Sequence, residues 1–180
     1  YQKSTSEQFQ IQLLVGLFAL SLILTSVYIS WISGFFLIGI IVFYLMVSII
    51  APFYDVPALK KTGDLTYHSS LFVSERPKNG IIKVHGGTLL DYIFVIDHQS
   101  KGPQRTKFIL QEYLEGLLNL MEELPPESKN SRVRGTSYII NEKTAQRIGF
   151  QVVETDFLDT LILTLNYFNV MLTLSLAKGT

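Results

Sequence analysis

The sequence predicts a membrane-anchored α+β protein, in which an N-terminal transmembrane hairpin of two helices precedes a small mixed α/β domain with a mostly antiparallel sheet. The first observation is a charge-free, strongly apolar run from Gln8 to Tyr54. The second is the remainder of the chain, where short β-branched and aromatic runs mix with amphipathic segments without a regular βαβ period. Together they predict a membrane anchor followed by a folded domain.

The charge-free run is long enough to cross a bilayer twice. A hydrocarbon core about 30 Å thick requires about 20 apolar residues in a helix. The first span is expected from Phe9 to about Tyr28, and the second from about Ile32 to Ala51, where Pro52 ends it. Residues 1–8 then form a flank, and residues 9–54 form the hairpin.

Aromatic and basic side chains near the ends of both spans predict the membrane interfaces, because such residues favour the headgroup level. The connection between the spans contains no Lys or Arg, whereas Lys3, Lys60 and Lys61 flank the hairpin. The positive-inside rule therefore predicts an integral protein of the inner or plasma membrane, with both termini and the domain on the cytoplasmic side. The predicted interface residues are Tyr28, Trp31, Phe53, Tyr54, Lys60 and Lys61.

Neither predicted span contains Asp, Glu, Lys, Arg or His, and such residues mark the ion and proton pathways of transporters. We therefore expect the hairpin to serve as an anchor rather than as a transport path. Small and amide side chains let helices approach closely and form hydrogen bonds across their interface. The expected helix contact positions are Gln12, Gly16, Ala19 and Gly39.

The composition of the chain restricts the classes of partner and of chemistry that we expect. It contains 15 Lys and Arg, 15 Asp and Glu, and no Cys. A neutral chain argues against nucleic acid, which usually requires a basic face, so no nucleic-acid partner is expected. The absence of cysteine excludes disulfides, thiolate metal sites and cysteine nucleophiles. With no cofactor motif, the expected partners are the lipid bilayer and other membrane protein subunits.

After a linker at residues 55–64, the domain at residues 65–180 is expected to begin with β-structure. Runs rich in β-branched and aromatic residues predict strands at Leu65–Ser74 and Ile81–His85. The dipeptide Asn79-Gly80 between them is typical of a tight hairpin turn, since both residues tolerate positive φ. The first two strands are therefore expected to pair antiparallel.

The middle of the domain is expected to contain one long helix between two strands. An apolar run predicts a strand at Tyr92–Ile96, and a second strand is expected at Arg134–Ile140. Apolar residues at three- and four-residue spacing predict a helix at Gln104–Leu124, which Pro125-Pro126 ends. Its predicted apolar stripe comprises Leu110, Tyr113, Leu114, Leu117, Leu118, Met121 and Leu124.

The C-terminal third is expected to alternate helix and strand. Asn141 suits an N-cap and Gly149 a left-handed C-terminal position, so a helix is predicted at Asn141–Phe150. Short strands are expected at Gln151–Glu154 and at Met171–Ala177, where apolar and polar residues alternate. Between these two strands a further helix is predicted, with Thr155 or Asp156 as its N-cap.

Residues 157–177 allow a second interpretation, a third membrane span, because Asp159 is the only charge among them. The polar Asn, Thr and Ser side chains in this stretch and the alternation at its end favour the helix and strand instead.

Weak candidates for chemistry are His85, Asp91 and Asp97, because imidazole and carboxylate groups serve both acid–base catalysis and metal binding. Their spacing matches no ligand template. The segment His85-Gly86-Gly87 resembles the glycine-rich oxyanion loop of some esterases, but the chain contains no Gly-x-Ser-x-Gly nucleophile motif. We therefore expect these glycines to allow a bend between strands.

The sequence is compatible with two functions. The first is a non-catalytic, membrane-anchored accessory subunit or adaptor, which binds a larger membrane complex through the hairpin, the domain or both. The alternative is a membrane-associated enzyme acting on a lipid-linked or amphipathic substrate through His85, Asp91 and Asp97. The absence of a recognisable catalytic motif favours the first.

Overall fold

The computed structural model describes residues 5–124, 131–137, 139–155 and 157–179. The chain divides into two compact units, Tyr1–Ala58 and Leu59–Thr180. The first contains the apolar helices, and the second contains a four-stranded sheet with its surrounding helices. The boundary falls within the predicted linker.

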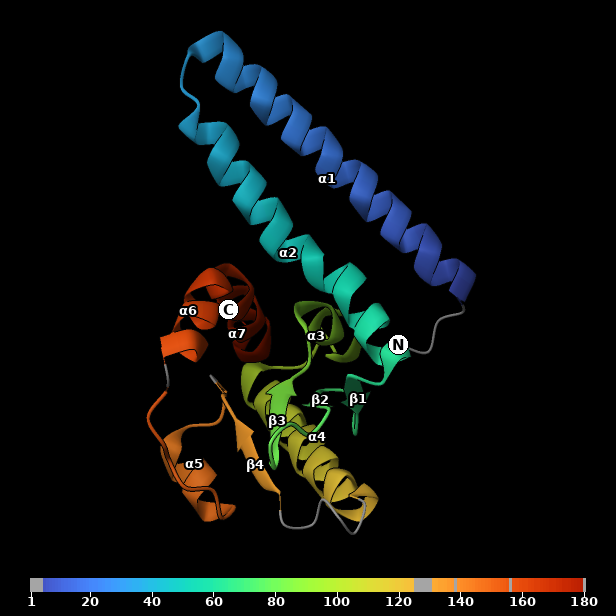
Figure 1. Cartoon of the computed structure of the whole chain (residues 1–180), viewed down its shortest axis with the longest axis vertical. Helices are drawn as coiled ribbons and strands as arrows, with labels where there is room; N and C mark the ends of the chain where they lie inside the picture. Colours follow the sequence, from blue (N-terminus) through green and yellow to red (C-terminus); the bar gives the residue numbers. More distant parts are fainter. Residues whose placement is uncertain (1–4, 125–130, 138, 156, 180) are drawn as a thin grey trace. The chain divides into compact units, whose positions relative to one another are not determined.

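The apolar unit is a helical hairpin, as the sequence predicts. Helix α1 spans Thr5–Ser33 and helix α2 spans Leu37–Thr62, and the two lie side by side in opposite directions (Figure 1). Both are long and apolar enough to cross a membrane. A turn with Gly34 at φ 71° joins them. The structure is thus compatible with two membrane crossings.

Helix α2 does not end at Pro52, and this prediction is wrong. The helix continues through Pro52 and Pro57 to Thr62, so most of the predicted linker 55–64 is helical. Each proline removes one backbone donor but fixes φ at a helical value, and the chain on both sides continues the helix. A single helix therefore runs from the apolar unit into the first residues of the domain.

The hairpin is held by polar groups that face inward between its helices. The Tyr54 hydroxyl on α2 donates a hydrogen bond to the Gln12 carbonyl on α1 at 2.8 Å. Gly16 makes room for this tyrosine, because a Cβ there would lie 2.6 Å from its hydroxyl. Near the turn, the Ser30 hydroxyl accepts a hydrogen bond from the Gly39 N–H at 3.0 Å. This bond satisfies one of the free donors at the start of α2, which a hydrocarbon environment would otherwise leave unpaired.

The domain contains one mixed sheet in the order β1-β2-β3-β4. Strands β1 (Leu65–Tyr67), β2 (Phe72–Glu75) and β3 (Ile81–Gly86) pair antiparallel, and β4 (Arg132–Gly135) lies parallel to β3. The sheet is therefore mostly antiparallel, as predicted. The predicted strand Leu65–Ser74 is wrong, since a tight corner at residues 68–71 divides it into β1 and β2.

The turn between β2 and β3 confirms the Asn-Gly prediction. Asn79 and Gly80 have φ values of 53° and 72°, and Lys78 and Ile81 exchange two backbone hydrogen bonds of 3.0 and 2.9 Å around them. Positive φ at both central residues defines a type I′ turn, whose twist matches that of the paired strands.

Two helices connect β3 to β4. Helix α4 (Gly102–Glu123) confirms the predicted long helix, whereas Pro125 and Pro126 lie outside the described residues. The predicted strand Tyr92–Ile96 is wrong, because this segment belongs to helix α3 (Leu89–Val95). Thr88 and Asp91 form a capping box that starts the helix, and this local signal prevails over the β-branched run.

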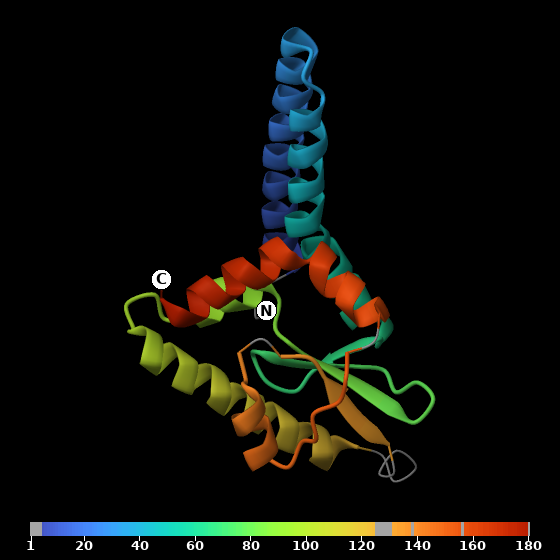
Figure 2. The ribbon, with the colours of Figure 1, turned by 90° about the vertical axis from the view of Figure 1, so that its left-hand side faces the viewer.

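After β4, the regular elements of the described residues are helices. Helix α5 (Glu142–Arg147) confirms the predicted caps, since the Asn141 side chain accepts from the Thr144 N–H at 2.9 Å and Gly149 has φ 90°. The remaining elements are α6 (Phe157–Leu165) and α7 (Tyr167–Lys178), which meet at a sharp bend (Figure 2).

Three predicted strands in this part of the chain need correction. Residues Gln151–Glu154 form no strand. Of the predicted strand Arg134–Ile140, only its first two residues belong to β4, which ends at Gly135, and Tyr138 lies outside the described residues. Met171–Ala177 belongs to α7. Its alternation of leucines suggested a strand, but the buried positions are Thr173 and Ala177, which are four residues apart and share one helix face.

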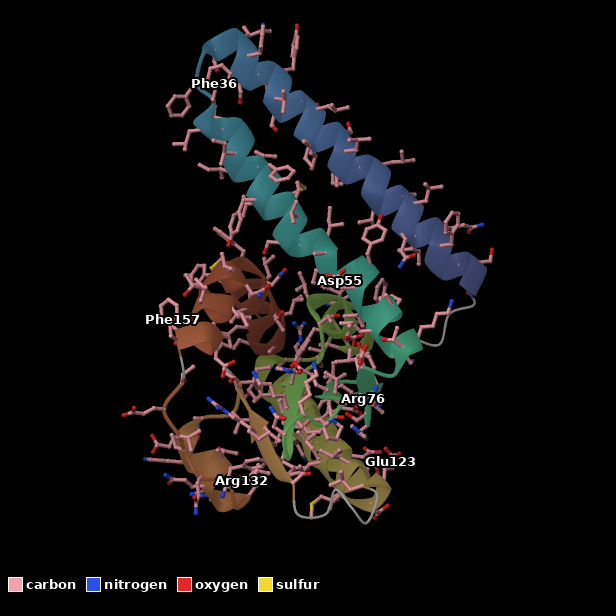
Figure 3. All side chains as sticks on the ribbon, viewed as in Figure 1. Phe36, Asp55, Arg76, Glu123, Arg132 and Phe157 are labelled. Atoms are coloured by element: carbon pink, nitrogen blue, oxygen red, sulfur yellow. The ribbon has the colours of Figure 1, made fainter. Side chains whose placement is uncertain are left out.

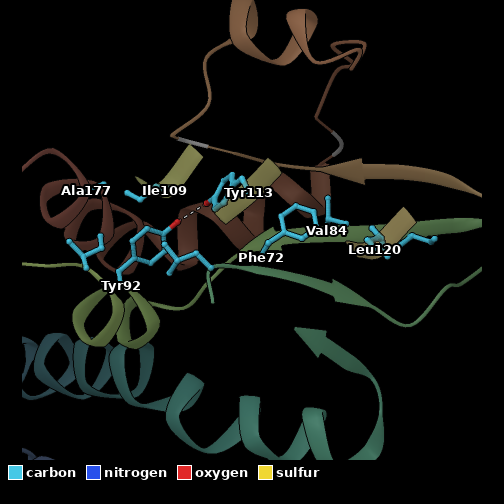
Figure 4. Close-up of a cluster of buried hydrophobic side chains, with 10 residues drawn as sticks. Phe72, Val84, Tyr92, Ile109, Tyr113, Leu120 and Ala177 are labelled. Carbon is cyan, nitrogen blue, oxygen red and sulfur yellow. Dashed lines mark hydrogen bonds between the residues drawn. The ribbon is translucent and has the colours of Figure 1, made fainter. Parts of the chain in front are cut away.

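The core of the domain lies between the sheet, α3, α4 and α7. Helix α4 faces it with Ile109, Tyr113, Gly116 and Leu120, whereas Leu118 and Met121 of the predicted stripe are exposed. Figure 4 shows Ile109, Tyr113 and Leu120 with core side chains of β2, β3 and α3. The buried core residues are Leu71, Phe72, Ile82, Val84, Tyr92, Ile96, Ile109, Tyr113, Leu120 and Ala177.

Gly116 sets the distance between α4 and the sheet. A Cβ at this position would overlap the Cβ of Phe72 on β2 and the near edge of its ring. Protein interiors are packed too densely to absorb such an overlap without a shift of backbone or side chain. The absence of a side chain at residue 116 thus lets the helix rest directly on Phe72.

The change Gly116→Ala therefore tests the close approach. Alanine is the better helix former by about 1 kcal/mol, but overpacking a core costs about 1–3 kcal/mol. We expect the clash with Phe72 to prevail, so that hydrogen–deuterium exchange of the β2 and β3 amides in the full chain becomes faster. Glu115→Ala, at an exposed neighbouring position, is the matched control and should leave exchange unchanged. Unchanged or slower exchange in Gly116→Ala would contradict the close approach.

Candidate functional site

The three residues singled out for chemistry occupy separate local settings. His85 on β3 forms an exposed pair with Glu75 on β2, with 2.8 Å between Nε2 and Oε1. Asp97 accepts a hydrogen bond from the Gln99 N–H at 2.9 Å in the turn before α4. Within the described part of the chain, no hydrogen bond or ion pair joins any two of His85, Asp91 and Asp97.

Asp91 is the one buried member of this set, and its carboxylate organises the start of α3. One carboxylate oxygen accepts hydrogen bonds from the Thr88 N–H at 2.7 Å, the Thr88 hydroxyl at 2.9 Å and the Tyr67 hydroxyl at 2.8 Å. Only 3% of the residue is exposed. Asp91 therefore ties β1 to the N-terminus of α3, a role that satisfies a buried charge by hydrogen bonding.

The glycines of His85-Gly86-Gly87 permit close contacts. A Cβ at Gly86 would overlap the Tyr113 hydroxyl and lie 3.1 Å from the Tyr92 hydroxyl. These two buried hydroxyls form a 2.6 Å hydrogen bond against the strand (Figure 4). A Cβ at Gly87 would lie 3.0 Å from the Asp91 Cβ. The segment thus serves close packing at the end of β3, and the resemblance to an oxyanion loop has no further support.

A polar chain that the sequence did not indicate joins Ser74, His68 and Glu123. The Ser74 hydroxyl on β2 lies 2.8 Å from Nε2 of His68, and Nδ1 of His68 lies 2.7 Å from Oε2 of Glu123 at the end of α4. A carboxylate only accepts, so Nδ1 donates to Glu123, which leaves Nε2 facing the serine hydroxyl. The side chain of Asn119 also donates to the His68 carbonyl at 2.7 Å.

This connectivity is that of a serine–histidine–acid relay, in which histidine removes the proton of a nucleophilic hydroxyl. Burial argues for a structural role. Ser74 and His68 are only 6% and 8% exposed, and Ser74 lies within β2 opposite Thr66 on one side and Val84 on the other. The relay secures the corner between β1 and β2 to the end of α4.

No sequence signal pointed to this relay. Ser74 and His68 are six residues apart on either side of a corner that was predicted as continuous strand, and Glu123 is 55 residues from His68. The three groups meet only because α4 lies along the sheet. Among the described residues, no group of three or more His, Cys, Asp or Glu side chains is arranged to hold a metal ion.

An ionic cluster stabilises the start of α6. The Asp159 carboxylate forms two ion pairs. Its Oδ1 lies 3.2 Å from Lys83 Nζ on β3, and its Oδ2 lies 3.2 Å from Arg134 Nη2 on β4. The Asp159 side chain is 16% exposed, so its charge is largely withdrawn from solvent and balanced by two cations. Asp159 is the only charged residue between Phe157 and Ala177.

Helices α6 and α7 also carry exposed apolar side chains. We define the apolar corner as six exposed side chains of α6 and the first half of α7, of which Phe157 is the most exposed at 79% and projects from the start of α6 (Figure 3). Soluble monomers rarely expose a contiguous apolar patch of more than a few hundred Å². The apolar corner comprises Phe157, Leu161, Ile162, Leu165, Tyr167 and Met171.

The predicted membrane-interface residues remain predictions. Tyr28 and Trp31 are exposed near the turn of the hairpin, and the side chain of Phe53 lies outside the described residues, as does Lys3. Tyr54 donates to Gln12 within the hairpin, and Lys60 lies over the Tyr67 ring at 5.4 Å from its centroid.

The chain matches no protein-family model, no curated protein and no solved structure. Its function is therefore argued from its own residues.

The structural interpretation of the relay predicts how its members couple. Removing a partner from a buried polar group costs about 1–3 kcal/mol. We expect His68→Ala to lower the protection of β2 amides from hydrogen exchange by about that free energy, and Ser74→Ala by less. The double variant should lose less than the sum, since both changes interrupt one chain. Additive losses would contradict the relay.

Chemical labelling of the full chain tests the alternative that the relay activates Ser74 as a nucleophile. A fluorophosphonate probe labels serines that a relay activates, and buried Ser74 should remain unlabelled in native membranes, with Ser74→Ala as the control. Labelling that Ser74→Ala abolishes would overturn the structural assignment.

Proposed function

We propose that this chain is a membrane-anchored, non-catalytic accessory subunit or adaptor that binds a larger membrane protein complex. In this proposal α1 and α2 span the membrane, both termini and the domain lie on the cytoplasmic side, and the domain presents surfaces to partners. The charge asymmetry around the hairpin supports the orientation.

One observation carries the proposal: the chemistry-bearing side chains of the domain are already engaged in structural contacts. Asp91 caps α3 and binds Tyr67, His68 and Ser74 secure a corner, and Asp159 is neutralised by two cations. These structural contacts favour a binding function for the domain over a catalytic one.

The hairpin supports the same conclusion. Two hydrogen bonds, from Tyr54 to Gln12 and from Gly39 to Ser30, join its two helices, and many of its exposed side chains are large and apolar. Such a surface suits lipid or the apolar helices of another subunit.

A protein partner has a candidate surface on α4. Leu118 and Met121 are each 60% exposed and lie three residues apart, so they are neighbours on one helix face. Exposed acidic side chains, Glu115 and Glu122, accompany them on this helix. A partner with apolar side chains rimmed by basic residues would complement this face. Tyr113, which belongs to the predicted apolar stripe of the same helix, is buried in the core and is not part of this surface.

The test is the size and content of the native particle. The tagged full chain is extracted from native membranes in a mild detergent, separated on a native gel, and its companions are identified by mass spectrometry. We expect stoichiometric co-migration with other membrane proteins, and partial loss of these companions in Leu118→Ser/Met121→Ser. The matched control is Lys107→Ser/Gln111→Ser, which changes two exposed positions nearer the start of α4. Migration of the chain alone, near its own mass plus detergent, would contradict the proposal.

The second candidate is a membrane-associated hydrolase, and the relay of Ser74, His68 and Glu123 is the observation that favours it. It requires a movement that exposes the Ser74 hydroxyl, with the bilayer supplying a lipid-linked or amphipathic ester. Migration of the chain alone together with fluorophosphonate labelling of Ser74 would favour this candidate over the adaptor.

A further inference from the structure

We propose that the apolar corner of α6 and α7 lies in the membrane interface, with lipid headgroups and upper acyl chains as its occupant. The domain would then be a monotopic membrane element in addition to being tethered by the hairpin. This inference goes beyond the adaptor proposal, because it concerns lipid and holds for the isolated chain as well as for a complex.

Helices α6 and α7 are apolar enough to enter a membrane, but the bend between them does not suit a membrane-spanning helix. Asp159–Leu165 and Tyr167–Lys178 together have the composition of a membrane-spanning helix, but they are bent by 73°. Helix α6 contains nine residues and α7 twelve, which correspond to about 13 and 18 Å. Neither covers a hydrocarbon core of about 30 Å.

The second half of α7 is also committed to the domain. Thr173 and Ala177 are each 2% exposed, and Arg105 of α4 donates through Nη1 to the Leu176 carbonyl at 2.9 Å. Straightening α6 and α7 into one span would break this hydrogen bond and remove Ala177 from the core. The structure therefore supports a surface element in place of the third membrane span that the sequence left open.

The charges around the corner fit an anionic lipid surface. Asp159 would oppose insertion if it were free, but Lys83 and Arg134 balance it, leaving one net positive charge in the cluster. These two cations are 43% and 34% exposed, so they remain accessible to headgroup phosphates. An apolar helix face with flanking basic residues is the arrangement of helices that lie in the interface plane.

A short connection joins the domain to the predicted second membrane span. Helix α2 runs without interruption from Leu37 to Thr62, and the domain begins at Leu59. In a helix, Leu59 lies only about 8 Å beyond Tyr54, the end of the charge-free run. A domain attached so close to the bilayer meets lipid at a high effective concentration, whereas a second copy of the chain must first diffuse to it.

The absence of cysteine permits a direct test in the full chain. The purified protein carries one cysteine, Leu165→Cys in the apolar corner or Leu118→Cys as the matched control, because both are leucines at least half exposed on helices of the domain. Each is labelled with the environment-sensitive dye NBD and placed in nanodiscs of phosphatidylcholine and phosphatidylglycerol. The nanodiscs contain or lack lipid with a doxyl quencher near the headgroup.

We expect NBD at residue 165 to emit at shorter wavelength than at residue 118, to be quenched at least twofold by doxyl lipid, and to be protected from aqueous iodide. The dye at residue 118 should show the opposite pattern. Equal iodide quenching at both residues would overturn the proposal, as would protection at residue 165 without doxyl quenching, which indicates a protein cover such as a second copy.

Tyr167→Cys provides a second position in the corner if the label at residue 165 disturbs folding. Because the nanodiscs contain only this chain, a negative result here leaves the accessory-subunit proposal intact. Conversely, doxyl quenching combined with migration of the chain alone would support the lipid contact and reject the adaptor.

Discussion

The close approach of α4 to β2 is the constraint on which the rest of the domain depends. With no side chain at Gly116, the helix rests on Phe72, whose ring then meets Tyr113 edge to face at a centroid distance of 6.1 Å. This position brings the Tyr113 hydroxyl to Tyr92 on α3, over Gly86 of β3. Aromatic pairs of this kind and a satisfied buried hydrogen bond fix one arrangement of the core. The two glycines thus position two helices against the sheet.

The same core determines what the C-terminal helices expose. Helix α7 places Thr173 and Ala177 inward, where small side chains allow it to pack against α3 and α4. Its bend from α6 leaves Phe157, Ile162 and Leu165 outward. The apolar content of residues 157–177 therefore serves two purposes, with one part completing the core and the other available for the membrane interface that we propose.

The hairpin and the capped or turn-bounded elements were predictable because their signals are local. Length without charge indicates the two apolar helices, and Asn79-Gly80 and Asn141 carry their turn and cap in their own side chains. The α3 segment was misread because its β-branched run outweighed the Thr88–Asp91 capping box. The strand prediction for the α7 segment is wrong because alternating leucines favour a half-buried strand, whereas the residues that are buried are the small Thr173 and Ala177.

The candidate site was less predictable than the fold. His85, Asp91 and Asp97 drew attention by residue type, but folding gives each a different local partner. The relay of Ser74, His68 and Glu123 depends on a corner between strands and on the register of α4 along the sheet, which are tertiary properties. Sequence periodicity reports neither.

The most direct test of the account is the membrane topology of the full chain, measured in sealed vesicles with a membrane-impermeant maleimide. Single cysteines at exposed positions are placed in the hairpin turn (Ser33→Cys), on α4 (Glu115→Cys) and at the end of α7 (Lys178→Cys). Two spans followed by a surface-bound domain predict that residues 115 and 178 react from one side and residue 33 from the other. Labelling of residue 178 together with residue 33 would show a third span, and labelling of all three from one side would refute the membrane-spanning hairpin.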